Sequence, residues 1–353
     1  MRVLITGGAG FIGGCAAVGL AERHPEWEIV ALDNLRRRGS ELNLPRLRAA
    51  GIEFSHGDVR SLDDLLAVGN VDALVECSAE PSILAGVGES PDYAVKSNLL
   101  GAYHCLELAR RSQAQVVFLS TSRVYPVALL SELALAETDT RYELVDSQPV
   151  PGASPDGIAE DFPLGGARTL YGATKLAAEL LIEEYRSAYG LSAAVNRCGV
   201  IAGPWQMGKV DQGVFTYWML AHHFGRELRY LGYGGAGKQV RDLLHVDDLV
   251  ELVERQLADP AGWDGFVGNV GGGRACSLSL VETTELCASI TGRRVAVVAD
   301  ATPRPGDVPV YLSDCRRLLA RTDWRARHGP AEILGDIHAW VSEHEDTLRR
   351  TLK

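Results

Sequence analysis

The chain has 353 residues, with 35 Lys and Arg against 46 Asp and Glu, so its formal net charge at pH 7 is −11. This length allows one large domain or two smaller ones, with a core that needs neither disulfides nor a metal. The acidic balance argues against nucleic acid as a partner, because non-specific binding to nucleic acid depends on clustered Lys and Arg. A few local cations would still be enough to hold a phosphate-bearing ligand.

The cysteines and the apolar runs indicate the cellular compartment. The seven cysteines include no Cys-x-x-Cys pair, so we expect neither a disulfide framework nor a zinc site. No apolar run approaches the roughly 20 residues that a membrane-spanning helix needs. We therefore expect a cytoplasmic protein that binds no metal ion and contacts no membrane.

In the first half of the chain, short β-branched runs alternate with helical patterns. Near-continuous apolar runs predict buried parallel strands at 2–6, 28–32, 52–55, 73–77 and 116–120. Helices are expected at 11–23, 62–68, 92–111 and 171–189, and a further strand at 193–197. This alternation predicts an α/β protein with a Rossmann-like, doubly wound parallel sheet.

The remaining sequence is less regular. Segment 127–170 is rich in Glu, Asp, Gly and Pro and has no sustained periodicity, which is typical of a long functional loop. After Gly199 the alternation breaks down, which indicates a smaller, mostly C-terminal lobe. We expect a cofactor-binding domain over 1–198, with its long loop at 127–170, and a mainly substrate-binding lobe over 199–353. Within that lobe, 237–260 is expected to return to the first domain.

A glycine-rich turn follows the first predicted strand. Gly7, Gly10 and Gly13 stand in a G-x-x-G-x-x-G spacing that leads into the first helix. Glycines at this spacing permit a tight turn, a close approach of the backbone to a pyrophosphate, and close packing of helix on strand. The free N–H groups and positive dipole end of the helix would then face the phosphates. A tight turn without a ligand would use the same glycines.

Asp33 ends the second predicted strand, 20 residues after Gly13, where it would hydrogen-bond a ribose diol. Its charge would repel a 2′-phosphate, which favours NAD over NADP. The run Arg36–Arg38 would favour a 2′-phosphate, or is simply a solvated loop face. Asp58, after the third strand, is expected to cap a helix or to contact the adenine.

Tyr171 and Lys175 stand four residues apart, on one face of a predicted helix. An ammonium beside a phenol stabilises the phenolate, so a tyrosine in this setting can act as a base near neutral pH. The spacing alone would also suit an exposed helix face. Thr121 strengthens the catalytic interpretation, because it ends the fifth strand at the sheet edge where such folds bind ligands. Its hydroxyl would share a proton with Tyr171.

With these motifs, the chain resembles the extended short-chain dehydrogenase/reductase enzymes that modify nucleotide sugars. The resemblance covers essentially all of the sequence. It includes the glycine turn, Asn98-x-x-Gly101, Thr121, the Tyr171/Lys175 pair, and the stretches 241–248, 269–273 and 304–307. Within that family, the stretches 33–35, 137–142, 211–213 and 237–242 are most similar to the CDP-paratose 2-epimerases.

The resemblance implies NAD-dependent epimerisation of a nucleotide-diphosphate sugar by transient oxidation to a keto-sugar, at C2 of a CDP-linked hexose. A UDP-sugar 4-epimerase is the alternative. A dehydratase fits less well, because family dehydratases carry an Asp-Glu pair where this chain has Ser122-Arg123. A non-catalytic NAD-binding sensor also fits less well, because such relatives typically lose the Tyr or the Lys.

The resemblance also implies site residues and an assembly. The catalytic set is Thr121, Tyr171 and Lys175. The implied cofactor contacts are Gly7, Gly10, Phe11, Ile12, Gly13, Asp33, Asn34, Asp58, Val59, Ala79, Asn98, Tyr171 and Lys175. The implied substrate contacts are Thr121, Gln206, Gln212, Arg241 and Arg304, although either Arg would also suit a structural ion pair, for instance with Asp307. The partners implied are a nucleotide-sugar substrate and further copies of the chain, as a homodimer or homotetramer formed through 92–111 and 171–189.

The sequence departs from the family pattern in several places. Where relatives have His-x-Ala-Ala/Gly-Gln, this chain has Glu76-Cys77-Ser78-Ala79-Glu80, which adds two carboxylates near the cofactor. Pro126 replaces a usual glycine. Val200 replaces a polar residue, and Ala202 replaces a tyrosine. We expect the first change to alter how tightly NAD is held, and the change at Val200 to weaken the case for diphosphate contacts.

Overall fold

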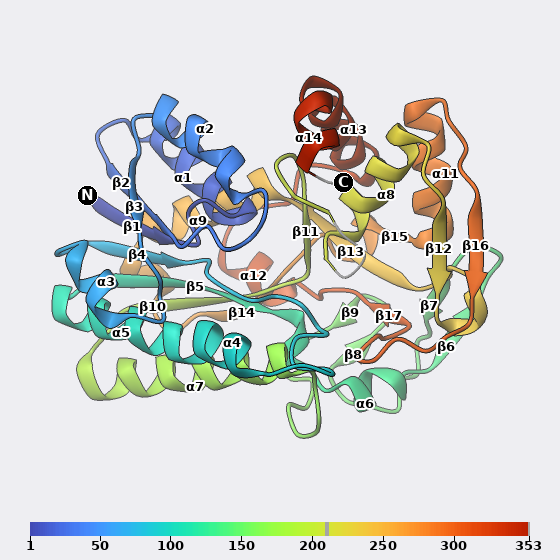
Figure 1. Cartoon of the computed structure of the whole chain (residues 1–353). Coiled ribbons are helices and arrows are strands. Elements are labelled where there is room, and N and C mark those ends of the chain that lie inside the picture. Colours follow the sequence, from blue (N-terminus) through green and yellow to red (C-terminus); the bar gives the residue numbers. More distant parts are fainter. Residues whose placement is uncertain (209–211, 352–353) are drawn as a thin grey trace. The chain divides into compact units, whose positions relative to one another are not determined.

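The computed structural model describes residues 1–208 and 212–351, which form two compact units (Figure 1). The first unit comprises Met1–Thr121, Leu170–Arg197 and Leu249–Val267. The second comprises Ser122–Thr169, Cys198–Asp248 and the chain from Gly268 onward. Each unit therefore collects segments that are far apart in the sequence.

The largest sheet is parallel and has seven strands in the order β14-β10-β5-β4-β1-β2-β3. The strands are β1 (Arg2–Thr6), β2 (Glu28–Asp33), β3 (Glu53–His56), β4 (Ala73–Glu76), β5 (Gln115–Thr121), β10 (Ala193–Cys198) and β14 (Val267–Val270). In register, Leu4 of β1 lies opposite Val30 of β2 and Leu74 of β4, and all three are fully buried. The strand order reverses at β1, so the carboxyl ends of β1 and β4 form the switch point where such folds bind ligands.

Helices cover both faces of this sheet, with α1, α2 and α9 on one face and α3, α5 and α7 on the other (Figure 1). The helices of the first unit are α1 (Phe11–Arg23), α2 (Leu44–Ala49), α3 (Leu62–Ala67), α4 (Asp92–Val95), α5 (Gly101–Ser112), α7 (Leu170–Tyr189), most of α9 (Val246–Ala258) and α10 (Pro260–Trp263). Leu106 of α5 and Ile182 of α7 share one buried apolar cluster with strand residues such as Phe118. The predicted Rossmann-like, doubly wound fold is confirmed.

The predicted elements of the first unit exist, with small differences at their ends. The helix expected at 92–111 is interrupted by a wider π-helical turn, Lys96–Leu100, between α4 and α5. Helix α2 has no counterpart among the predictions. It has only six residues and begins with a proline near its first position, so it is too short to display a helical period.

The second unit consists of shorter elements. Its helices are α6 (Val127–Ser131), α8 (Val214–Phe224), α11 (Leu280–Thr291), α12 (Arg316–Arg321), α13 (Pro330–Glu343) and α14 (Glu345–Thr351). Its strands are β6 (Leu135–Glu137), β7 (Tyr142–Leu144), β8 (Ala153–Ser154), β9 (Gly157–Ile158), β11 (Val200–Ala202), β12 (Leu228–Leu231), β13 (Val240–His245), β15 (Ser277–Ser279), β16 (Val297–Asp300) and β17 (Val310–Tyr311). Strand β13 is central, since it pairs with β11, β15 and β17.

Segment 127–170 is not the featureless loop of the first domain that its composition predicts. It contains α6 and β6 to β9, and 122–169 belongs to the second unit. The N–H of Tyr142 donates to the carbonyl of Lys238 at 3.0 Å, and that of Ile158 to the carbonyl of Leu312 at 2.9 Å. Because these partners are distant in sequence, no local period reports the pairing.

The segment that returns to the first unit also differs from the expected 237–260, since it is Leu249–Val267. Strand β13, which lies inside the expected range, stays in the second unit with its three partner strands. In the first unit, the Gln115 side chain donates to the carbonyl of Leu257 at 2.8 Å, and the N–H of Val195 to the carbonyl of Phe266 at 2.8 Å. These bonds hold the end of α9 and the chain after it to the sheet.

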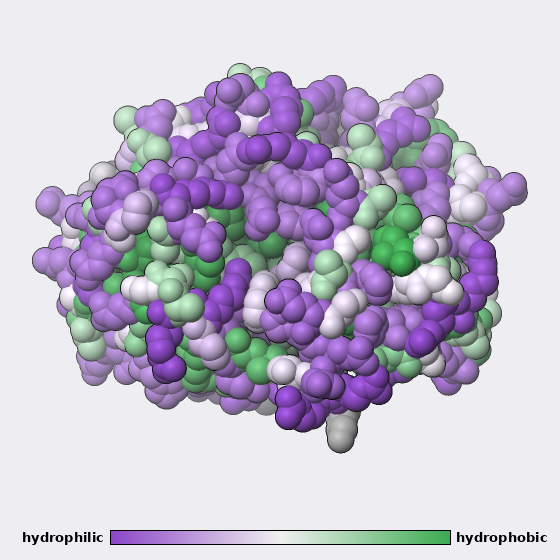
Figure 2. Space-filling model, turned by 90° about the horizontal axis from the view of Figure 1, so that it is seen from above, coloured by the Kyte–Doolittle hydropathy of each residue, from purple (hydrophilic) through white to green (hydrophobic). Residues whose placement is uncertain are grey.

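No helix in the described part of the chain is both long and apolar enough to cross a membrane. On the face drawn in Figure 2, hydrophilic residues predominate, and the apolar ones form separate patches rather than a continuous belt.

Asp242 of β13 is a fully buried carboxylate. The N–H of Gly273 donates to its Oδ2 at 3.2 Å, and a Cβ at position 271 would lie 2.2 Å from the same oxygen. Burial raises the pKa of Asp242 to about 6.

The raised pKa of Asp242 predicts a specific pH dependence of stability. The native state holds this proton more tightly than the unfolded chain, whose Asp pKa is near 4, so stability decreases as pH rises from about 4 through about 6. Asp242→Asn removes this loss. The free energy of unfolding of the variant, relative to wild type, should rise by about 2–3 kcal/mol over that interval and then stay constant. Urea denaturation at a series of pH values measures it, and a difference independent of pH would contradict the prediction.

Candidate active site

The glycine turn after β1 is built for close backbone contact. Gly7 has a φ of 63°, and its carbonyl accepts the N–H of Gly10 at 2.9 Å. A Cβ at Gly13 would lie only 2.2 Å from the Gly7 carbonyl oxygen, so a side chain at this position would force the turn apart. Within the described ranges, no side chain caps the N-terminus of α1, and its first turn has no acidic residue. The turn therefore presents free N–H groups to an anion.

Asp33 ties this turn to the end of β2. Its Oδ2 accepts the N–H of Ala9 at 3.1 Å and its Oδ1 the N–H of Leu35 at 2.8 Å. Burial raises the pKa of Asp33, and these N–H groups only partly offset that effect. A carboxylate has acceptor sites beyond those that single backbone donors use, so the predicted bond to a ribose diol is compatible with this geometry.

Asp58 is held by an ion pair. Arg60 approaches it in the two-pronged manner, with Nη2 2.7 Å from Oδ2 and Nε 2.9 Å from Oδ1, and Asn34 donates to Oδ2 at 2.8 Å. Burial would raise the pKa of Asp58, but the bonds from Arg60 and Asn34 lower it to about 2. Of the two roles expected for Asp58, the helix cap is wrong, because Ser61 caps α3 through the N–H of Asp64. The adenine contact stays a prediction.

The neighbouring arginines stack on a tyrosine. The guanidinium of Arg36 lies 4.0 Å from the centre of the Tyr93 ring, and that of Arg60 lies 4.8 Å from it. Arg36, the first residue of the basic run, is thus engaged in a cation–π contact and is not simply a solvated side chain.

Val59 and Asn98 connect the adjoining segments. The buried Val59 packs closely against Gly101. A Cβ at position 101 would lie only 2.7 Å from Cγ2 of Val59, so only glycine fits there. The Asn98 amide accepts the N–H of Glu80 at 2.7 Å and donates to the Glu80 carbonyl at 3.1 Å and to Thr174 Oγ1 at 3.2 Å. Asn98 therefore clamps the segment containing Ala79 to the first turns of α7, and its predicted contact with the cofactor stays a prediction.

The three predicted catalytic residues lie in the first unit. Thr121 ends β5, and Tyr171 is the second residue of α7. Lys175 follows one turn later and is only 1 % exposed, whereas Tyr171 is partly exposed. The Lys175 Nζ lies 4.3 Å above the ring of Phe118. The lysine is thus a buried cation beneath a more accessible phenol.

Glu76, the last residue of β4 and the first of the stretch that departs from the family pattern, pairs with this lysine. Its Oε2 lies 2.9 Å from Lys175 Nζ, and both side chains are 2 % exposed. Burial would lower the pKa of Lys175, but the Glu76 carboxylate, with a contribution from Tyr171, more than offsets that effect, so the pKa is raised. The extra carboxylate is visible in the sequence, but its pairing with Lys175 is not, because the two residues are 99 positions apart.

A second buried pair lies one turn further along α7. Arg197 of β10 binds Glu179 with Nη2 2.8 Å from Oε2, and the hydroxyl of Ser120 donates to the same carboxylate. Because Ser120 precedes Thr121, this network ties the end of β5 to the middle of α7. None of the three predicted catalytic residues belongs to this network.

The predicted diphosphate-binding arginines lie in the second unit. Arg241 pairs with Asp307, with Nη2 2.6 Å from Oδ1, so the alternative of a structural ion pair is realised for this residue. Arg304 has no hydrogen bond or ion pair from its guanidinium to any residue of 1–208 or 212–351. Arg123, which sequence reasoning used only to argue against a dehydratase, donates to the carbonyl of Gly306 at 2.9 Å. Two arginines, Arg123 and Arg241, thus bond to the turn at 304–307, which itself begins with Arg304.

Gln206 and Gln212 differ in their freedom to bind a ligand. The Gln206 amide donates to the Ile201 carbonyl at 3.0 Å and accepts from Thr216 at 2.8 Å, which ties its segment to α8. Both polar atoms of the Gln212 amide are buried without a partner in the described residues. Of the two, Gln212 therefore retains the hydrogen-bonding capacity that a substrate contact requires.

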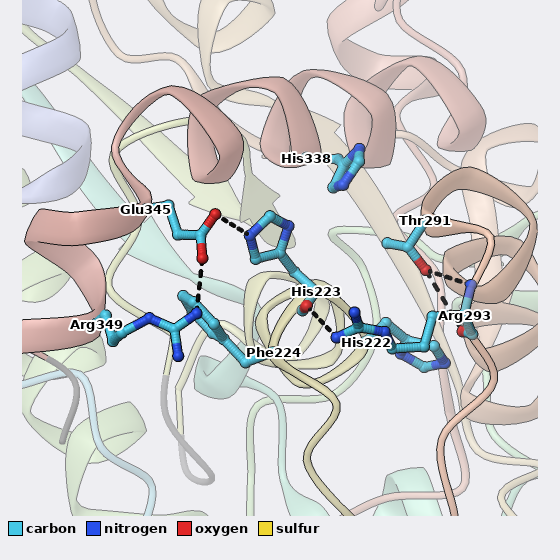
Figure 3. A pocket seen from close by; sticks show the side chains of 8 residues that line it. All are labelled: His222, His223, Phe224, Thr291, Arg293, His338, Glu345 and Arg349. Carbon is cyan, nitrogen blue, oxygen red and sulfur yellow. Dashed lines mark hydrogen bonds and ion pairs between the residues drawn. The ribbon is translucent and has the colours of Figure 1, made fainter.

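A separate cavity of about 300 Å³ opens in the second unit and contains none of the predicted residues (Figure 3). His223 lies 3.4 Å from Glu345, and Arg349 binds the same carboxylate at 2.6 Å. Three of the lining residues, His223, Glu345 and Arg349, thus satisfy one another, whereas His222 Nε2 is buried without a partner in the described residues. Nowhere in the described chain do three His, Cys, Asp or Glu residues group so that they could hold a metal ion.

Comparison with known proteins assigns the chain to a family. The sequence model of the NAD dependent epimerase/dehydratase family matches residues 3–271. CDP-paratose 2-epimerase of Salmonella typhi is 28% identical over 97% of this chain and 99% of its own length. A dTDP-glucose 4,6-dehydratase of Mycolicibacterium smegmatis is 29% identical over 99% and 96%. The UDP-glucose 4-epimerase of Thermus thermophilus, solved in complex with NAD, superimposes with a TM-score of 0.74 at 26% identity over 97% and 99%. The chain therefore belongs to the NAD-dependent epimerase/dehydratase family.

Proposed function

We propose that the protein is a nucleotide-sugar epimerase that transiently oxidises one carbon of the sugar, with C2 of a CDP-linked hexose as its site of action. The observation that carries this proposal is the arrangement of Thr121, Tyr171 and Lys175 at the carboxyl edge of the parallel sheet, in the unit that also holds the glycine turn. The choice of a CDP-linked substrate rests on the similarity to the Salmonella typhi enzyme over nearly the whole chain.

The residues present suit NAD. The glycine turn and the uncapped start of α1 would hold the pyrophosphate, and Asp33 would accept the ribose hydroxyls. When bound, NAD supplies the hydride acceptor and donor that makes the oxidation reversible.

The protein's own residues manage the proton. As phenolate, Tyr171 removes the proton from the sugar hydroxyl, and the ammonium of Lys175 stabilises the negative charge on the phenol. The hydroxyl of Thr121 hydrogen-bonds the same sugar oxygen and orients it. At the end of the cycle Tyr171 returns the proton, so that an epimerisation consumes none.

Epimerisation requires that the sugar ring turn over while the rest of the substrate stays bound. Arg304 would hold the diphosphate, because a guanidinium group matches phosphate oxygens in geometry and charge. Binding energy from this remote handle then retains the keto-sugar while its ring reorients.

A 4-epimerase of UDP-sugars is the second candidate, favoured by the similarity to the Thermus thermophilus structure. The same three residues would act on a different ring position. A dehydratase has less support, because Ser122 and Arg123 follow Thr121 at the point where family dehydratases carry an Asp-Glu pair. The Arg123 guanidinium is bound to the Gly306 carbonyl.

We also propose self-association as a homodimer or homotetramer in the cytoplasm. Large apolar side chains are exposed on the expected helices, namely Tyr103 of α5 at 38 % and Leu180 and Tyr189 of α7 at 58 % and 59 %. Covering such side chains would stabilise an interface between copies of the chain.

Tyr171→Phe should lower kcat by about 100-fold or more, because the variant lacks the group that transfers the proton. Its NAD content, measured after denaturation, should match that of wild type. Tyr189→Phe is the matched control, since this exposed tyrosine lies at the far end of the same helix. Wild-type turnover by Tyr171→Phe would refute the assigned role.

A panel of CDP- and UDP-hexoses in deuterated water should identify one isomerised substrate whose carbon-bound hydrogen is retained. Retention is expected because the oxidised carbon recovers its own hydrogen. Mass spectrometry and proton NMR of the product measure it. Solvent deuterium at that carbon would exclude the oxidation–reduction route, and no turnover of any sugar would favour a sensor.

Arg304→Ala should raise KM for the nucleotide sugar by about tenfold or more with little change in kcat, because a charge-assisted bond to the diphosphate acts equally before and during the reaction. Steady-state kinetics separate the two parameters. Arg294→Ala is the control, because Arg294 is 75% exposed and pairs with Glu285. Equal effects of both substitutions would argue against a diphosphate contact at Arg304.

A further inference from the structure

The last residue of β4 introduces a negative charge into the interior of the first unit. Glu76 is 2 % exposed and lies next to the switch point of the sheet. In the described chain its only cationic partner is the Lys175 ammonium, and the N–H of Ser78 also bonds to its carboxylate. Because burying a carboxylate costs free energy, the presence of Glu76 at this position needs a structural or a functional explanation.

Among the groups that most affect the charge of Lys175, Glu76 is the only carboxylate. Besides Glu76, the groups that face it are the Tyr171 phenol on α7, the thiols of Cys77 after β4 and Cys105 on α5, and the Phe118 ring on β5. All of these are neutral in their ordinary states. An ammonium in a dry site with only neutral neighbours tends to lose its proton.

The second buried pair offers an internal comparison. Arg197 keeps its charge with or without Glu179, because a guanidinium does not lose its proton in a protein. Lysine differs, since it becomes neutral readily when it is buried. A carboxylate beside Arg197 therefore affects packing, whereas a carboxylate beside Lys175 also decides whether that residue is charged.

We propose that Glu76 is a positioning residue of the active site, whose carboxylate fixes the Lys175 ammonium beneath Tyr171 and keeps it protonated throughout the working pH range. The inference rests on the proposed function, because it assigns Lys175 the task of stabilising the Tyr171 phenolate. Glu76 itself acts through Lys175 and transfers no proton.

The test is the titration of Lys175 in Glu76→Gln. The chain has only five lysines, so nitrogen-15 spectra of the lysine Nζ atoms are simple, and Lys175→Gln identifies the signal. In the NAD-loaded wild type, Lys175 should stay protonated to at least about pH 10. In Glu76→Gln the midpoint of the Lys175 titration should fall by about two pH units or more. An unchanged midpoint would overturn the proposal.

Activity gives the second readout. Wild type should lose little activity between about pH 8 and pH 9.5, whereas Glu76→Gln should acquire a decline there that follows the Lys175 midpoint. Glu76→Asp keeps the charge and should restore the wild-type profile. A uniform loss of kcat at every pH would indicate a purely structural pair and would overturn the proposal.

Glu80→Gln is the matched control. Glu80 is the other carboxylate of the same departure, and its side chain accepts the N–H of Ser82 at 3.3 Å rather than pairing with Lys175. In Glu80→Gln the midpoint of the Lys175 titration should equal that of wild type. If Glu76→Gln does not fold, the wild-type titration still decides, because a Lys175 midpoint below about pH 9 would refute the proposal. The Nζ spectra need no turnover, so absence of epimerase activity would count against the proposed function alone.

Discussion

The burial of one ammonium group constrains the first unit of this protein. Lys175 lies in a site from which water is almost excluded, and a charge there requires a counter-charge. Glu76 supplies it from the end of β4, and the ring of Phe118 on β5 covers the same ammonium. Two neighbouring strands and one helix thus meet around a single cation, which sets the position of Tyr171 one turn earlier.

The glycine turn depends on a different constraint, the contact distance between backbone atoms. Gly13 lies so close to the Gly7 carbonyl that no side chain fits, and Asp33 holds the turn through the N–H of Ala9. These contacts leave the start of α1 open to an anion. The net charge of −11 therefore says little about this site, because a helix N-terminus creates local positive potential.

Much of the first unit was predictable because its signals are local. The apolar runs of β1 to β5 and the glycine spacing are complete within short windows of sequence. The segment at 127–170 was not predictable in this way. Its strands β7 and β9 hydrogen-bond to Lys238 and Leu312, so composition alone indicated a loop where the fold has an organised part of the second unit. The ion pair of Arg241 with Asp307 also joins residues far apart in the sequence. The sequence suggested Asp307 as a partner but did not decide between this ion pair and a contact with the diphosphate.

By itself, the sequence determined the α/β class, the glycine turn and the spacing of the predicted catalytic tyrosine and lysine, because each is encoded by neighbouring residues or by a fixed spacing along one helix. The tertiary structure decided which charge stands beside that lysine. Glu76 and Lys175 are 99 residues apart, and only the pairing of β4 with β5 beneath α7 brings them within 2.9 Å. The physical reason is that a buried charge is stabilised by whatever lies next to it in space, and adjacency of this kind leaves no periodic pattern in the chain.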